Sequence, residues 1–155
     1  MTLNVQHTVK GKEAGLRGLI SQLHFPDVLF LQEVGKLHPD HALHPLYQSW
    51  IIPGHGAQMG VAIMLKKDPT LVVHAQDFMV NYRSLVLCVT YLGTKYLLAN
   101  VYLHADGDVA GNQEVLDWLL PHITTTYDAL VIVVGGAACQ CRLGPWPQRG
   151  FGTCV

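Results

Sequence analysis

The sequence predicts a single α/β domain in which helices cover the faces of a β-sheet. Two observations predict this class: apolar runs of strand length alternate with two helical stripes, and Gly and Pro separate the runs. Half of the 155 residues are hydrophobic and only 14% are charged. The usual charged share is about 25%, so we expect much of the chain to be buried. A chain of this length can bury a substantial core.

The first part of the chain alternates strands with one helix. Residues Thr2–Val5 suit a short strand, and Glu13–Leu23 carries Leu and Ile at the spacing of one helical face. Pro26 blocks continuation of that helix. The apolar run Val28–Leu31 suits a strand that is covered on both faces. Further strands are expected at Ser49–Ile52, Gly60–Leu65 and Leu71–Ala75.

A β-hairpin is the clearest feature of the second part. The expected strands Ser84–Leu92 and Lys95–Leu103 flank Gly93-Thr94, and Gly first in a two-residue loop predicts a type II′ turn. Residues Asn112–Ile123 then carry a helical apolar stripe. The last strand, Val131–Val134, is apolar throughout, and we expect it to be central and buried.

The turn after this last strand lacks an acidic residue. A buried strand that runs into a Gly-Gly turn is where a sheet delivers catalytic groups to its carboxyl edge. Here Gly135-Gly136 is followed by Ala137, Ala138, Cys139 and Gln140. The fold therefore does not by itself imply the activity.

Three segments together resemble the endonuclease/exonuclease/phosphatase superfamily, whose members have the DNase I-like fold. The segments are Pro26–Val34 (PDVLFLQEV), Asn100-Val101-Tyr102 and Val131–Gln140. The likeness is closest to the endonuclease domains of LINE-type non-LTR retrotransposons, in which the turn reads Gly-Gly-Asp-Phe-Asn. The resemblance implies a four-layer α/β sandwich of two packed sheets with helices outside. It covers about residues 2 to 145, so residues 1–155 are expected to form a single, incomplete domain that is truncated at its C-terminal end.

The resemblance implies a site at the strand ends around Glu33. In the family, the residues that match Asn4 and Glu33 sit together and the Glu binds Mg²⁺. The residue that matches Tyr102 lies beside the scissile phosphate, where its hydroxyl can donate a hydrogen bond. Mg²⁺ prefers oxygen ligands and keeps several waters, so weak binding is expected from this set. Without the resemblance, Glu33 is a solvated strand end and Tyr102 an ordinary aromatic residue on a strand.

The catalytic acid of the family has no counterpart here. A gapless match places Ala137 at the Asp position and Cys139 at the Asn position, and with one inserted residue Gln140 takes the Asn position. A thiol or an amide cannot replace a carboxylate base, whose loss typically removes about 10²–10⁴-fold of rate. The C-terminal Asp-His pair of the family is also missing. We therefore expect an endonuclease-like domain that is inactive.

Three other interpretations are compatible with the same residues. The chain could be a non-catalytic binding module of this architecture, which the missing acid and the low net charge favour over an active enzyme. It could be a decayed retrotransposon fragment. Hydrolysis of a small phosphorylated molecule is less favoured, because no feature selects such a substrate.

Three histidines, His38, His41 and His44, recur at every third position beside Pro39 and Pro45. The prolines argue against a regular helix, so loop histidines are expected. A zinc site would need a fourth ligand and fixed geometry, and it is not favoured.

Four further polar residues have simple explanations. Asp106 and Asp108 flank Gly107 in a polar loop, where turn chemistry accounts for them. His104 is expected to lie at the surface. Arg83 precedes a strand, and a charged strand entry is favoured over a phosphate contact.

Charge and hydropathy limit the partners and the location. The formal net charge of −1 lacks the basic footprint typical of nucleic-acid binders, but a bound metal ion supplies local positive charge, so DNA stays a candidate partner. No signal peptide opens the chain and no run reaches the roughly 18 apolar residues of a membrane span. We expect an intracellular protein, nuclear or cytoplasmic. An uncovered sheet edge or apolar patch should promote self-association.

Overall fold

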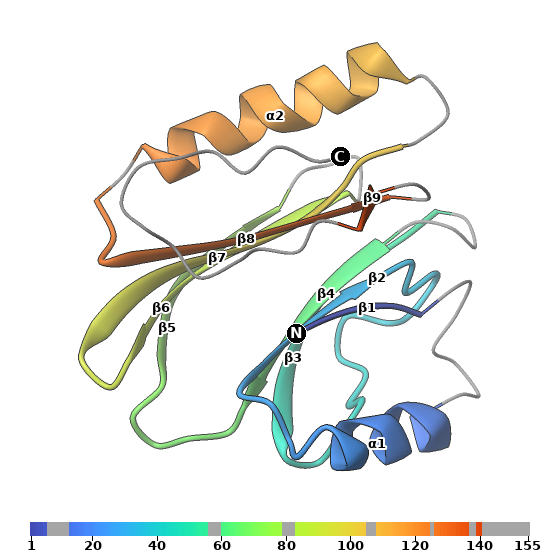
Figure 1. The fold of residues 1–155 in the computed structure, drawn as a ribbon, viewed down its shortest axis with the longest axis vertical. Helices are drawn as coiled ribbons and strands as arrows, with labels where there is room; N and C mark the ends of the chain where they lie inside the picture. Colours follow the sequence, from blue (N-terminus) through green and yellow to red (C-terminus); the bar gives the residue numbers. More distant parts are fainter. Residues whose placement is uncertain are drawn as a thin grey trace.

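The chain forms four layers in the order helix, sheet, sheet, helix (Figure 1). The computed structural model describes residues 1–5, 13–55, 60–78, 83–104, 108–124, 126–136 and 139–140. Within these residues, the α/β class and the four-layer sandwich expected from the sequence are confirmed.

The first sheet has four strands in the spatial order β1-β2-β4-β3. Strands β1 and β2 are parallel, because helix α1 carries the chain back between them, and β4 is antiparallel to both of its neighbours. The elements are β1 (Thr2–Asn4), α1 (Glu13–Gln22), β2 (Val28–Gln32), β3 (Tyr47–Pro53) and β4 (Gly60–Lys66).

The second sheet has the order β5-β6-β7-β8-β9. Strands β5, β6 and β7 form an antiparallel meander, and helix α2 then crosses over to β8, which is parallel to β7. The elements are β5 (Val72–Phe78), β6 (Ser84–Tyr91), β7 (Thr94–Tyr102), α2 (Val109–Ile123), β8 (Ala129–Gly136) and β9 (Cys139–Gln140).

Apolar side chains fill the three spaces between the four layers. Successive residues of a strand face opposite sides, so on β7 Leu98 packs between the sheets, whereas Leu97 and Ala99 pack against α2. The central space holds a buried cluster from both sheets, and α1 covers the first sheet with Leu16 and Ile20. The central cluster contains Phe30, Val61, Ile63, Leu65, Leu85, Leu87, Val89, Leu98 and Tyr102.

The β6–β7 hairpin turns one residue earlier than predicted, and with a different turn. Tyr91 pairs with Thr94, so the two loop residues are Leu92 and Gly93. Their φ angles are 49° and 81°. Positive φ at both positions defines a type I′ turn, whereas type II′ needs it only at the first. The prediction of a Gly93-Thr94 type II′ turn is therefore wrong, because Gly93 supplies the second left-handed residue and Leu92 the first.

Helix α2 begins at Val109, three residues before the predicted start at Asn112. The earlier start follows from Asp108, whose side chain caps the helix by accepting a hydrogen bond from Gly111 N at 3.1 Å. A polar cap of this kind extends a helix beyond the apolar stripe from which it was predicted.

Strand β8 is less buried than predicted. Residues Val131–Val134 are partly exposed, and the strand has a full-length partner only in β7. On its other side, β9 pairs only with Gly135 and Gly136. The expectation of a central, buried strand is therefore wrong for the described residues, because burial depends on the neighbouring strands as well as on the strand's own apolar character.

Candidate functional site

Glu33 follows β2 directly and has a left-handed backbone, with φ of 59°. This conformation costs a non-glycine residue about 1–2 kcal/mol, so the surroundings must hold it. Val34 N donates to Gly60 O at 3.2 Å, and Gly54 N donates to Gly35 O at 2.8 Å. The turn leaves Glu33 buried, with 7% of its surface exposed. Strained residues of this kind cluster at functional sites.

Two donors from other strands meet the Glu33 carboxylate. Oε1 accepts a hydrogen bond from Asn4 Nδ2 at 2.9 Å and from the Tyr102 hydroxyl at 3.1 Å. Asn4 ends β1 and pairs in register with Gln32, while Tyr102 ends β7 in the other sheet. The expected meeting of Asn4, Glu33 and Tyr102 at one edge is confirmed as geometry.

The Glu33 carboxylate suits a hard cation. Within the described part of the chain no Lys, Arg or His forms an ion pair with it, and its second oxygen accepts no hydrogen bond. Carboxylate oxygen is a preferred ligand of Mg²⁺, which keeps several waters around one or two such groups. Among the same residues, no group of three His, Cys, Asp or Glu side chains is arranged to hold a metal ion. The chemistry of this single carboxylate therefore fits a hard cation such as Mg²⁺ that keeps several of its waters.

Arg83 is tied to α2 next to this site. Its backbone carbonyl accepts a hydrogen bond from Tyr102 N at 2.8 Å. Its guanidinium donates to Asp108 Oδ2 at 2.6 Å and to Asn112 Oδ1 at 3.4 Å, and only 9% of the residue is exposed. The hydrogen bond from Arg83 lowers the pKa of Asp108, as does the one from Gly111 N. Arg83 thus connects Tyr102 of β7 to the start of α2, a role that was not predicted from the sequence.

The residues after Tyr102 are held by the same helix. The Asn112 side chain accepts from His104 N at 2.9 Å and donates to His104 O at 2.8 Å. The His104 ring meets the Tyr102 ring edge-on, with centroids 5.5 Å apart. His104 is partly exposed, as expected, and it borders the site.

Two buried amide side chains lie beside the carboxylate, and neither was predicted to have a role. Gln32 precedes Glu33 and Asn100 lies two residues before Tyr102, with 2% and 0% of their surfaces exposed. A signal was present in the sequence, because Asn100 interrupts the apolar strand β7 and Gln32 ends the apolar strand β2. A buried polar side chain needs a hydrogen-bond partner.

The other candidate residues lie apart from this site or outside the described residues. The three histidines lie outside helices and strands, which confirms the loop position expected for them. His44 packs edge-on against Tyr47, His41 lies near Glu13 and His38 is exposed. Ala137 and Asp106 lie outside the described residues. Of Cys139 and Gln140 the structure describes only the backbone of β9.

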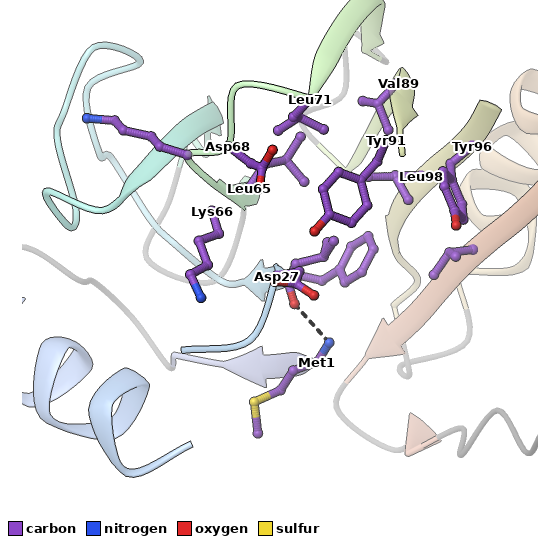
Figure 2. Close-up of a pocket in the computed structure, with 14 residues that line it drawn as sticks. Met1, Asp27, Leu65, Lys66, Asp68, Leu71, Val89, Tyr91, Tyr96 and Leu98 are labelled. Carbon is purple, nitrogen blue, oxygen red and sulfur yellow. Dashed lines mark hydrogen bonds between the residues drawn. The ribbon is translucent and has the colours of Figure 1, made fainter. Parts of the chain in front are cut away.

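A cavity of about 470 Å³ opens at the opposite end of the two sheets (Figure 2). It lies near the starts of β2 and β7, whereas Glu33 and Tyr102 lie at their ends. Apolar side chains such as Leu65, Leu98 and Val89 line it, with Tyr91 beside them. Burial raises the pKa of the Tyr91 hydroxyl, as do the nearby carboxylates of Asp27 and Asp68.

Comparison with known proteins identifies the family. The model of the endonuclease/exonuclease/phosphatase family matches residues 1–134. The chain belongs to this family. The matched range includes Asn4, Glu33 and Tyr102, and the observed sheets and helices have the DNase I-like α/β fold. No curated protein sequence matches the chain significantly.

Several solved structures share this fold. A humanized D. rerio TDP2 superposes with a TM-score of 0.60 at 22% identity, over 87% of this chain and 59% of that one. The human Nocturnin catalytic domain with a bound sulfate anion gives 0.57 at 17%, over 82% and 56%. The 3′ phosphatase NExo from Neisseria, bound to a product DNA hairpin, gives 0.57 at 16%, over 86% and 55%. The chain thus spans little more than half the length of these structures.

No helix within the described part of the chain is long and apolar enough to cross a membrane.

Proposed function

We propose that this chain is a nuclease-type phosphodiesterase domain that binds a divalent cation and DNA at Glu33 but hydrolyses phosphodiesters little or not at all. The observation that carries the proposal is the buried Glu33 carboxylate. Its Oε1 is held by Asn4 and Tyr102, and no basic side chain among the described residues forms an ion pair with it. A buried carboxylate without a cationic partner is costly, so a bound cation would stabilise it.

Glu33 would hold Mg²⁺ through its carboxylate, and Asn4 would fix the orientation of that carboxylate. When bound, the ion would supply positive charge beside a phosphate oxygen. Tyr102 can rotate its hydroxyl from Glu33 towards a phosphate, to which a phenol donates a hydrogen bond. DNA is the proposed substrate class, because NExo of the same fold is bound to a product DNA hairpin.

The low activity in this proposal follows from the residues after β8. Ala137 stands where the family has its catalytic Asp, and neither Cys139 nor Gln140 carries a carboxylate. The loss of one positioned base removes about 10²–10⁴-fold of rate. Kinship with LINE-type endonucleases belongs to the same proposal and rests on the PDVLFLQEV segment and the Gly-Gly turn. The alternative is a module that only binds, and the absence of a carboxylate at these positions favours it over an active enzyme.

The experiment is a nicking assay with supercoiled plasmid in Mg²⁺ and in Mn²⁺, joined to a measurement of DNA binding. We expect no nicking above a metal-only control, and metal-dependent DNA binding that Glu33→Ala weakens. Glu114→Ala removes an exposed carboxylate on α2 and is the matched control. Nicking by the wild type that Glu33→Ala abolishes would refute the proposed lack of activity. DNA binding that Glu33→Ala leaves unchanged would refute the role of Glu33 in binding.

A further inference from the structure

Two buried amide side chains join the sheets directly behind the site carboxylate. Gln32 Nε2 donates to Asn100 Oδ1 at 3.2 Å and to Val101 O at 3.1 Å. Asn100 Nδ2 donates back to Leu31 O and Ala62 O, both at 2.9 Å. These hydrogen bonds connect β7 of the second sheet with β2 and β4 of the first, in a space closed to solvent.

Gly135 makes room for the Gln32 amide. It pairs in register with Tyr102 and lies on the face of β8 that packs between the sheets. A Cβ at this position would lie 2.6 Å from Gln32 Nε2 and closer still to the other atoms of that amide. Gly135 is not among the residues with positive φ. Its need for glycine is therefore steric rather than conformational.

Each of the three site residues, Asn4, Glu33 and Tyr102, lies within two sequence positions of a residue that makes these hydrogen bonds or bonds to Gln32. Glu33 follows Gln32, and Tyr102 lies on the same face of β7 as Asn100. Asn4 precedes Val5, whose backbone N–H donates to Gln32 O at 3.0 Å. A slip of one sheet over the other would therefore separate the Tyr102 hydroxyl from the Glu33 carboxylate.

We propose that Gln32, Asn100 and Gly135 form an inter-sheet clamp that positions the Glu33 carboxylate against Asn4 and Tyr102 and so sets its affinity for a divalent cation. The effect on cation affinity rests on the proposed function, whereas the effect on geometry does not. The clamp residues act through Glu33 and do not touch the metal ion. Loss of such supporting partners typically weakens metal binding about 10–100-fold.

Two variants disturb the clamp without changing the three site residues. Gln32→Met keeps the length of the side chain but removes both N–H donors. Gly135→Ala adds one methyl group where the Gln32 amide lies. Tyr47→Phe is the matched control, because it removes a partly buried hydrogen bond, to Pro26 O at 2.7 Å, on the other face of the first sheet. Circular dichroism checks that each variant is folded, and Gly135→Ala carries the test if Gln32→Met unfolds.

The first readout is the pair of side-chain amide signals of Asn4 in the NMR spectrum of the metal-free protein. These protons report the hydrogen bond to Glu33 directly. We expect them to shift and to exchange faster in both clamp variants and to stay unchanged in Tyr47→Phe. The second readout is the affinity for Mn²⁺, which we expect to fall about tenfold in both clamp variants.

A coupled pair of substitutions tests whether Gly135 acts through Gln32. Gln32→Ala leaves space for a methyl group at position 135. In that background, Gly135→Ala should change the Mn²⁺ affinity by less than about twofold, because contacting residues are not additive. Equal effects of Gly135→Ala in both backgrounds would overturn the role of Gly135.

The outcomes separate the clamp from the proposed function. Wild-type Asn4 signals in folded Gln32→Met and Gly135→Ala would overturn the clamp. Unchanged Mn²⁺ affinity in Glu33→Ala would overturn the metal role of Glu33, and the Asn4 signals would still decide the clamp. Wild-type Mn²⁺ affinity in both clamp variants, together with loss of binding in Glu33→Ala, would show that the clamp does not set the cation site.

Discussion

Tyr102 and Glu33 join the two sheets of the sandwich through one hydrogen bond of 3.1 Å between the phenol hydroxyl and carboxylate Oε1. The two residues are 69 positions apart in the sequence and both are buried. A hydrogen bond to a charged group contributes about 1.5–3 kcal/mol. This contact therefore serves the stability of the fold as well as the geometry of the site.

The first prediction is that Tyr102→Phe lowers the free energy of unfolding by about 1.5–3 kcal/mol, because the ring stays packed while the carboxylate loses one donor. Urea denaturation measures the difference. Tyr96→Phe is the control, since Tyr96 lies on the same face of β7 and makes no hydrogen bond within the described residues. Equal losses in the two variants would show that the Tyr102 hydroxyl contributes nothing through Glu33.

The second prediction concerns the β6–β7 turn. Leu92 has a φ of 49° and is 70% exposed, so its side chain contributes little packing to offset the strain. Asn accepts the left-handed region more readily, and Asn-Gly is the preferred pair for a type I′ turn. We expect Leu92→Asn to raise the free energy of unfolding by about 1 kcal/mol, measured by urea denaturation.

Leu46→Asn is the control for Leu92→Asn. Leu46 is also exposed, at 48%, but it is not among the residues with positive φ. This variant should therefore not gain stability. A gain of the same size in both variants would mean that removal of an exposed Leu, rather than relief of backbone strain, is responsible.

Much of the fold could be predicted from apolar periodicity, because it reports local structure. The parallel β1–β2 pair placed Asn4 beside Glu33, and alternation along β7 could have placed Tyr102 and Asn100 on one face. The bond from Gln32 to Asn100 spans 68 positions, and no local pattern pairs them. For the same reason the contact from Arg83 to Asp108 was missed. Burial of β8 was overestimated, since it depends on which strands lie beside it.

The third prediction is self-association through the outer face of α2. Val109, Leu116 and Leu120 are spaced by seven and four positions, so they form one stripe, and their exposed fractions are 76%, 44% and 56%. Exposed apolar stripes of this kind promote association. Analytical ultracentrifugation should show dimers or larger species at high concentration.

The double substitution Leu116→Gln/Leu120→Gln should shift this equilibrium towards the monomer. Leu46→Gln, a single exposed Leu away from α2, is the control and should not. A strictly monodisperse wild-type monomer at high concentration would contradict the prediction. Association that the double substitution leaves unchanged would move the interface elsewhere, with the β1 and β3 edges of the first sheet as the next surfaces to test.

The last prediction is a loss of stability below about pH 6.5 that depends on His44. This residue is 7% exposed, and burial lowers its pKa from the ordinary 6.5, as does the positive charge of Arg17. His44 Nδ1 accepts a hydrogen bond from Leu46 N at 3.2 Å, which protonation would break. Because the folded pKa is lowered, the contribution of His44 is present above pH 6.5 and is lost as the pH falls through the folded pKa.

Urea denaturation at pH 7.5, 6.5 and 5.5 tests this dependence. His44→Asn offers an oxygen where Nδ1 accepts but does not titrate, so its stability should fall less between pH 7.5 and 5.5 than that of the wild type. His38→Asn is matched to it, because His38 Nδ1 also accepts a backbone hydrogen bond two residues on, from Asp40 N at 3.2 Å, but His38 is exposed. We expect the His38 variant to follow the wild-type curve. If His44→Asn also follows that curve, the acid sensitivity lies in other groups.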